Sequence, residues 1–178
     1  MFPSTSLPTV EHTTRTGQLR RQPTQTPGTD PLQLRFGGTH RLPRGLREEA
    51  AGMDWNLFTA TYAPQAEVRL HNLNSERLRG GLFRYTADRV RTSKTDQPRI
   101  TTREIISTGP ASACTGLLAE VGRHVEILSF HQLEIFEATV TFLHVTDSRR
   151  SRWAVGFGPN RDISVAAALS SAGQRIHG

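Results

Sequence analysis

At 178 residues and 19.8 kDa, the chain has room for one domain, or for one domain and a tail. It is too short for a (β/α)₈ barrel, which needs about 250 residues. Its hydrophobic fraction of 35% is below the roughly 45–50% of a fully packed chain, so part of the sequence is expected not to fold. The single cysteine excludes an internal disulfide and any multi-cysteine metal site.

A net charge of +6 raises the question of a nucleic-acid-binding protein. The basic residues are dispersed among loops, however, and no basic helix or RNA-binding aromatic motif is present, which argues against nucleic acid as a partner. No run approaches 18 apolar residues, and the N-terminus has no apolar signal region. The sequence therefore predicts no membrane span and no secretion signal, and we expect a cytoplasmic protein.

Residues 1–50 hold six of the ten prolines and show almost no apolar periodicity. A segment of this kind buries too little surface to offset its chain entropy. We therefore expect a disordered, Pro- and Arg-rich tail over residues 1–50.

The pattern changes at Asp54. Trp55, Phe58 and Tyr62 share one face of a short helix, with Asp54 as its N-cap and Pro64 after its end. We interpret residues 53–66 as a short linker helix. Runs typical of strands follow at 68–73, 81–90 and 100–106.

The third of these runs leads into Gly109-Pro110, where proline suits the first position of a helix because its missing N–H would have no partner there. Cys114, Leu117, Leu118 and Val121 then recur at helical spacing and form an apolar stripe. Gly122 is placed to end the helix with a positive φ angle.

The second half repeats this plan. Runs typical of strands occupy 125–133, 138–145 and 152–157, and Gly158-Pro159-Asn160 opens a last helix. The buried stripe of that helix is predicted to consist of Val165, Ala168, Leu169, Ala172 and Ile176. The sequence thus predicts an α+β fold of two pseudo-symmetric βββα repeats over residues 67–178, with repeats at about 67–123 and 124–178. One such unit covers one face of its sheet only, so pairing two copies has a purely structural explanation as well.

Several short motifs resemble the C-terminal regulatory domain of 2-isopropylmalate synthases of the actinobacterial type. The segment 109–113 resembles the Gly-Pro-x-x-Ala step of that domain's first repeat. The second repeat of the domain has a Trp-Gly-Val-Gly pattern followed by Asn and Ala-Leu, which resembles residues 153–157, Asn160 and Ala168-Leu169 here. Residues 128–131 and 138–140 occupy the places of two strands between them. Trp55, Phe58, Tyr62 and Pro64 resemble the helix, and the exit from it, that precede the domain. The resemblance covers about residues 53–177.

The resemblance implies a leucine sensor that dimerises and inhibits a separate catalytic barrel. It implies ligand contacts from both repeats and the intervening strands, at Gly109, Pro110, Ala113, Phe130, His131, Ala138, Gly158, Pro159 and Asn160. The physical reason is that N–H groups at a helix start attract a carboxylate, while Gly and Ala leave room for a branched side chain. The chain departs from the family in Ile105–Thr108, which replaces further glycines, and in Arg161, where an apolar residue is common.

No residue pattern indicates catalysis. The family's catalytic barrel holds its metal with a His-x-His pair, and no two of the seven histidines here are separated by one residue. Cys114 lies in the first turns of a helix, where a thiol pKa is lowered, yet its place in the apolar stripe favours a buried, inert thiol. We therefore expect a non-enzymatic module without metal or cofactor.

The leading hypothesis is a stand-alone regulatory-type domain that senses leucine or a related small amino acid in leucine biosynthesis. It would form a homodimer or associate with a full-length 2-isopropylmalate synthase. Two alternatives remain open from the sequence: a small basic nucleic-acid-binding protein, and a truncated, non-functional relic of the synthase.

Overall fold

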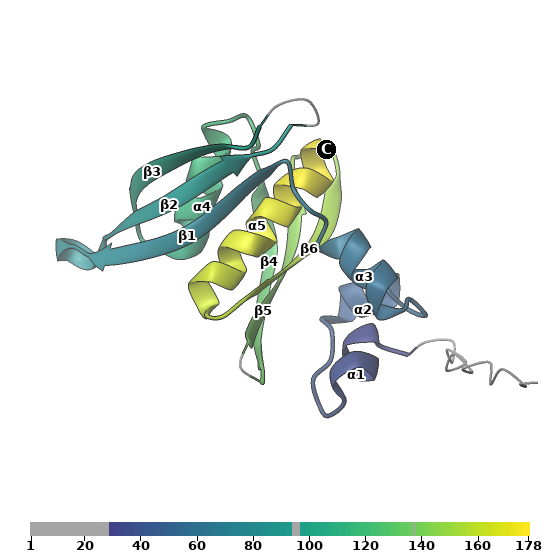
Figure 1. The fold of residues 1–178 in the computed structure, drawn as a ribbon. Coiled ribbons are helices and arrows are strands. Elements are labelled where there is room, and N and C mark those ends of the chain that lie inside the picture. The colour runs from purple at the N-terminus through teal and green to yellow at the C-terminus, as the bar shows by residue number, and fades with distance from the viewer. Residues whose placement is uncertain (1–28, 94–96, 137) are drawn as a thin grey trace, which may run out of the picture.

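Two three-stranded antiparallel sheets, each followed by a helix, form the body of the protein (Figure 1). The computed structural model describes residues 29–93, 97–136 and 138–178. The first sheet and its helix comprise β1 (Val68–Arg77), β2 (Phe83–Arg91), β3 (Arg99–Ser107) and α4 (Pro110–Ala119). The second comprises β4 (Glu126–Ile135), β5 (Ala138–Thr146), β6 (Ser151–Gly158) and α5 (Arg161–His177). The predicted α+β fold with two βββα units is confirmed, and each predicted strand is present with ends shifted by a few residues.

Strand β5 is the centre of the second sheet and is covered on both faces. Leu143 and Val145 lie on the face that α5 covers and belong to the main core cluster. Val140 and Phe142, which point the other way, belong to a second cluster on the opposite face. This two-sided burial explains why the strand carries apolar residues on both faces, since a half-buried strand would place polar residues on one of them.

Helix α5 packs on β6 at a distance that only glycine permits. A Cβ atom at Gly156 would overlap the backbone of Ala168, and one at Gly158 would lie 2.5 Å from the backbone nitrogen of Ser164. Both glycines are on the face of β6 that carries Ala154, which is also fully buried. The small side chains of β6 therefore set how deeply α5 sits on the sheet.

A polar network fixes the beginning of α5 on this surface. The hydroxyl oxygens of Thr141 and Ser164 are 2.7 Å apart, and both residues are fully buried. The side-chain amide nitrogen of Gln132 lies 3.0 and 3.1 Å from the two hydroxyl oxygens and 3.0 Å from the carbonyl oxygen of Arg161, so its two N–H groups are shared among three acceptors. Because buried polar groups are costly without partners, this set of bonds favours one register of α5 along the sheet.

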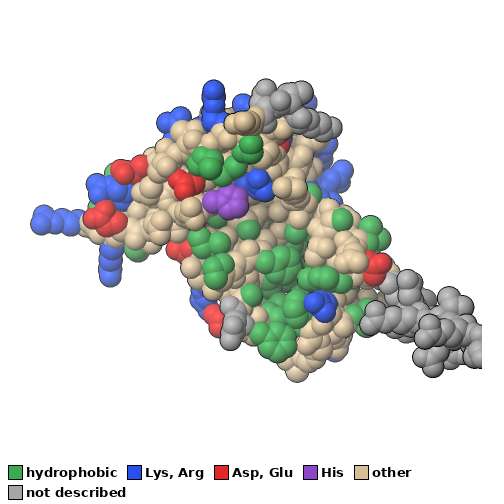
Figure 2. Space-filling model, viewed as in Figure 1, with side chains coloured by type: hydrophobic (Ala, Val, Ile, Leu, Met, Phe, Trp, Pro, Cys, Tyr) green, Lys and Arg blue, Asp and Glu red, His purple; other side chains and the backbone are tan. Residues whose placement is uncertain are grey.

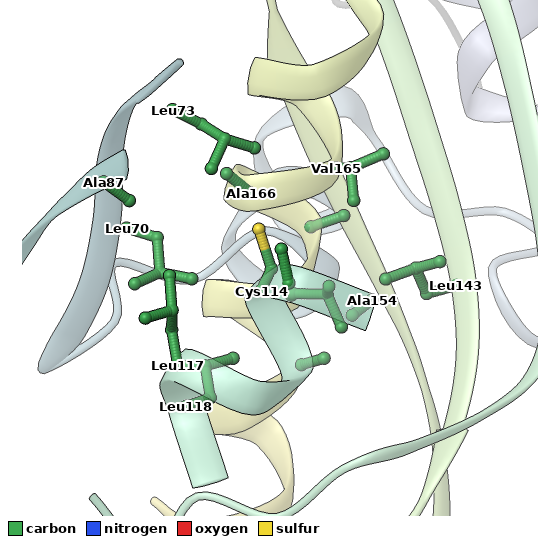
Figure 3. Packing of buried hydrophobic residues seen from close by; sticks show 14 of the residues in the cluster. Leu70, Leu73, Ala87, Cys114, Leu117, Leu118, Leu143, Ala154, Val165 and Ala166 are labelled. Carbon is green, nitrogen blue, oxygen red and sulfur yellow. The ribbon is translucent and has the colours of Figure 1, made fainter. Parts of the chain in front are cut away.

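The same helix also closes one edge of the first sheet. Strand β1 is an edge strand, and its outward N–H groups need acceptors. The N–H of Leu70 donates to Ser170 Oγ at 3.0 Å, and that of Glu67, just before the strand, donates to Gln174 Oε1 at 2.9 Å. Figure 3 shows the apolar core that results, in which Leu70 and Leu73 of β1, Cys114 of α4 and Ala166 of α5 approach one another.

The expectation of a disordered tail over residues 1–50 is wrong for residues 29–50. These residues form α1 (Pro31–Phe36) and α2 (Arg44–Glu49), which with α3 (Trp55–Tyr62) lie beside the second sheet (Figure 1). Leu32 and Leu46 are fully buried in the second core cluster, together with Phe58. The remaining part of the expected tail, residues 1–28, lies outside the described residues.

Helix α3 has the predicted start and end. The Asp54 carboxylate accepts from the N–H of Leu57 at 2.7 Å, and the helix ends before Pro64. The predicted linker helix is also part of the core, because Tyr62 is fully buried, donates to Glu49 at 3.1 Å and carries the Arg175 guanidinium 4.6 Å above its ring. Among the described residues, no helix is both long enough and apolar enough to cross a membrane.

The close contact between α5 and β6 predicts that Gly156→Ala is strongly destabilising. Its added methyl group meets backbone atoms, which cannot move aside as a flexible side chain would. We expect the free energy of unfolding, measured by urea denaturation, to fall by about 3 kcal/mol or more. Gly109→Ala is the control, since no atom lies within 4 Å of its added Cβ and its φ of −172° suits any residue. Equal stability of the two variants would contradict the packing described.

The folded N-terminal helices predict a role for Asp30, which is only 4% exposed. Its carboxylate accepts from Leu32 N–H at 2.9 Å as the cap of α1 and from Leu42 N–H at 2.8 Å, so it ties α1 to the loop before α2. Asp30→Ala leaves both donors unpaired and is expected to cost about 1–3 kcal/mol. Hydrogen exchange should accelerate at Leu32 and Leu42, and unchanged protection there would contradict the arrangement.

Candidate functional site

The two Gly-Pro helix starts lie at the same end of the molecule. Helices α4 and α5 pack side by side, and a Cβ atom added to Gly173, late in α5, would lie 3.9 Å from the side chain of Leu118, late in α4. At the other end, burial raises the pKa of the Cys114 thiol in α4, and the Asp162 carboxylate in the first turn of α5 is close enough to add to this effect. The two helices are therefore parallel, and their first turns lie at the same end of the molecule.

The start of α4 is unobstructed. Gly109 is the N-cap residue, is half-buried and provides no side chain, while Pro110 occupies the first helical position, as predicted. Ala113, one turn later, is fully buried in the main core cluster. Of these three predicted contacts, Gly109 and Pro110 are thus partly open to solvent, while Ala113 contributes to packing.

The start of α5 differs in detail. The helix begins at Arg161, so Pro159 precedes the N-cap instead of occupying the first turn as Pro110 does. The cap is Asn160, whose side-chain oxygen accepts from Ile163 N–H at 2.9 Å. Gly158-Pro159-Asn160 thus leads into the last helix as predicted, although Pro159 and Pro110 occupy different positions relative to their helices.

A surface cavity of about 310 Å³ opens beside the start of α5 and the β4–β5 hairpin. It brings together three of the predicted ligand residues from separate segments: Ala138, Pro159 and Asn160. Gly158 pairs with Thr139 across the two strands at its base. Four further residues line it: Glu134, Phe136, Thr139 and Arg161. The lining contains none of Gly109, Pro110 and Ala113.

Phe130 and His131 lie on opposite faces of the second sheet. Phe130 pairs with Leu143 on the α5 face and remains 43% exposed. His131 pairs with Phe142 on the other face, where its ring centroid is 6.4 Å from that of Trp153. Adjacent residues of a strand point in opposite directions, so these two side chains cannot line the same site within one chain.

Opposite charges meet at the cavity mouth. The Arg161 guanidinium approaches the Glu134 carboxylate at 3.1 Å, and both side chains are largely exposed. Burial raises the pKa of Tyr85 and of Cys114, and Asp162, the acid in the first turn of α5, adds to both effects, so its charge lies on the side of the first repeat. The cavity therefore offers one cation, one anion and a helix start, which together match the carboxylate and ammonium groups of a free amino acid.

Sequence reasoning missed Glu134, Phe136 and Thr139 as lining residues. Arg161 attracted notice only as a departure from the family pattern. The strand pairing could have indicated Glu134, because it pairs with Thr139, which in turn pairs with Gly158. That register depends on the hairpin between β4 and β5, which has no glycine-based turn signal to fix it.

The described residues offer no metal centre, since no group of three or more His, Cys, Asp or Glu side chains is placed to hold an ion. The Cys114 thiol is fully buried. Burial raises its pKa from 9.0 to about 12, and the Asp162 carboxylate acts in the same direction. A thiol of this kind is protonated at neutral pH and is a poor nucleophile.

No protein-family model matches the chain, and no curated protein matches it.

The raised thiol pKa predicts that Cys114 does not react with Ellman's reagent at pH 8 in the native protein and reacts fully in guanidinium chloride. It also predicts a pH effect. The unfolded thiol loses its proton from about pH 9, whereas the folded thiol keeps it to about pH 12. The free energy of unfolding should therefore fall over this interval, by up to about 1.4 kcal/mol per pH unit.

Cys114→Ala is the control for this pH effect. Its unfolding should show a shallower decline above pH 9, while Tyr62, whose pKa burial also raises, contributes equally to both proteins. Rapid labelling of the native thiol, or equal slopes in the two proteins, would contradict the buried state of Cys114.

Proposed function

We propose that the protein is a sensor module of the kind found at the C-terminus of 2-isopropylmalate synthases, and that it binds leucine or a related small amino acid. The observation that carries the proposal is the cavity at the start of α5, where Ala138, Pro159 and Asn160 meet beside Glu134 and Arg161. A zwitterion would place its carboxylate near Arg161 and its ammonium near Glu134. The apolar surfaces of Ala138 and Pro159 would then receive the side chain.

The parallel arrangement of α4 and α5 supports a contribution from the first repeat. Gly109 and Pro110 present an unobstructed helix start at the same end of the molecule as the Asn160-capped start of α5. In the proposed dimer, the first repeat of one chain would complete the cavity of the other. Exposed apolar side chains on β4, an edge strand, support such an association, since Leu128 is 52% and Phe130 43% exposed.

The proposed partners are a second copy of this chain or a full-length 2-isopropylmalate synthase. The proposed role is regulatory and not catalytic, and it assigns no chemistry to the Cys114 thiol, whose pKa burial raises. A module of this kind would act on leucine biosynthesis through its influence on the synthase.

Leucine should raise the melting temperature of the protein, because a ligand that binds only the folded state stabilises it. At tenfold excess over the dissociation constant, we expect a rise of roughly 3–6 °C in a thermal-shift assay. Glu134→Gln and Arg161→Gln should each remove most of the rise. Glu76→Gln is the matched control, because it breaks a similarly exposed ion pair with Arg84 on the outer face of the first sheet.

Gly109→Trp tests the first repeat in the same assay. No atom lies within 4 Å of the added Cβ, so the melting temperature without ligand should change little, while the leucine-dependent rise should disappear. Absence of any shift with leucine, isoleucine or valine in the wild-type protein would reject the ligand proposal. Light scattering tests the dimer, and capture of the organism's own synthase by the tagged chain tests the partner.

A further inference from the structure

A second cavity, also of about 310 Å³, lies between the two sheets on the outer side of α5. Its walls come from β1, β6, the outer stripe of α5 and the segment 63–66 that joins α3 to β1. Figure 2 views the molecule from the side on which β1 and α5 lie in front, and hydrophobic side chains gather on this face. None of the ligand residues predicted from the sequence lines this cavity.

Most of its lining is apolar, including Val155, Phe157, Ile163 and Ala167. Among its polar residues, Ser171 is notable because it is only 6% exposed and its hydroxyl bonds to no described residue. Its neighbour Ser170 is fully engaged, donating to Ala166 and accepting from Leu70. The Ser171 hydroxyl is therefore free to bond a group that enters the cavity.

Arg69, in the same lining, carries a buried side-chain donor without a partner. It forms no ion pair with any described residue, and its Nε–H is buried without an acceptor. The described part of the chain places no Asp or Glu in the lining. The nearest acid along the chain, Glu67, is already held by Arg123 at 2.7 Å. The described residues of the cavity thus leave this guanidinium without a counter-ion.

We propose that this cavity binds a small apolar monocarboxylate that carries no amino group. The guanidinium of Arg69 would accept a carboxylate in a charge-assisted pair, and Ser171 would donate to it. An ammonium group would find no acid here, which distinguishes this cavity from the one at Glu134 and Arg161. The volume is at the lower end of the range for small-molecule sites, and it suits a short branched chain against Val155, Phe157 and Ala167.

The test uses 4-methylpentanoate and its uncharged analogue 4-methylpentanamide, titrated into the full chain by isothermal calorimetry. We expect saturable 1:1 binding of the carboxylate and at least tenfold weaker binding of the amide, because charge-assisted hydrogen bonds contribute strongly to affinity. Arg69→Met should weaken carboxylate binding about tenfold to a hundredfold. Arg91→Met removes the same charge from a neighbouring exposed position outside the cavity and should bind as the wild type does.

Ala167→Leu gives a second, independent test, since it fills the cavity without changing charge. It should abolish carboxylate binding while leaving any leucine-dependent stabilisation intact, so this site and the one at the start of α5 can fail separately. The proposal is overturned if the wild-type protein does not bind 4-methylpentanoate, if the amide binds equally well, or if Arg69→Met and Ala167→Leu both bind at wild-type strength.

Discussion

The architecture depends on the contact between α5 and the glycine-bearing face of β6. Without side chains at Gly156 and Gly158, the helix backbone lies directly on the strand. This depth brings Ser164 to the Thr141 hydroxyl below and leaves Ser170 and Gln174 in position to bond the edge of β1. One helix therefore joins both sheets, so the two small βββα units share the main core cluster instead of each forming a marginal core of its own.

Both candidate sites arise from this placement of α5. Its start emerges beside the β4–β5 hairpin, where Arg161 and Glu134 supply opposite charges. On the outer side of α5, small residues such as Ala167 do not fill the gap between β1 and β6, and a cavity remains there. Arg69 lines this cavity, and no described acid forms an ion pair with it. The two cavities have similar volumes, but different charged residues line them. This difference is the basis for the two classes of ligand proposed.

The repeats have diverged in how they use their helices. Helix α4 has proline in its first turn, and its N-cap residue, Gly109, provides no side chain to cap the helix. Helix α5 is capped by the Asn160 side chain and is buried along much of its length, with Val165, Leu169 and Ile176 in the core. The second unit is thus the structural centre, and its outer face is further covered by α1, α2 and α3. The first unit keeps a solvated outer face, where Arg84 bridges Glu76 and Glu104.

The sequence by itself determined the two strand sets, the cap of α3 by Asp54 and the order of the repeats, because alternation, helical spacing and capping are local properties. It did not reveal that residues 29–50 fold. Leu32 and Leu46 lack a regular spacing, and their burial depends on a sheet face formed much later in the chain. Only the tertiary structure decided that Phe130 and His131 face apart, that Ala113 is packed away, and that Glu134 meets Arg161, since strand register and helix depth result from contacts between distant segments.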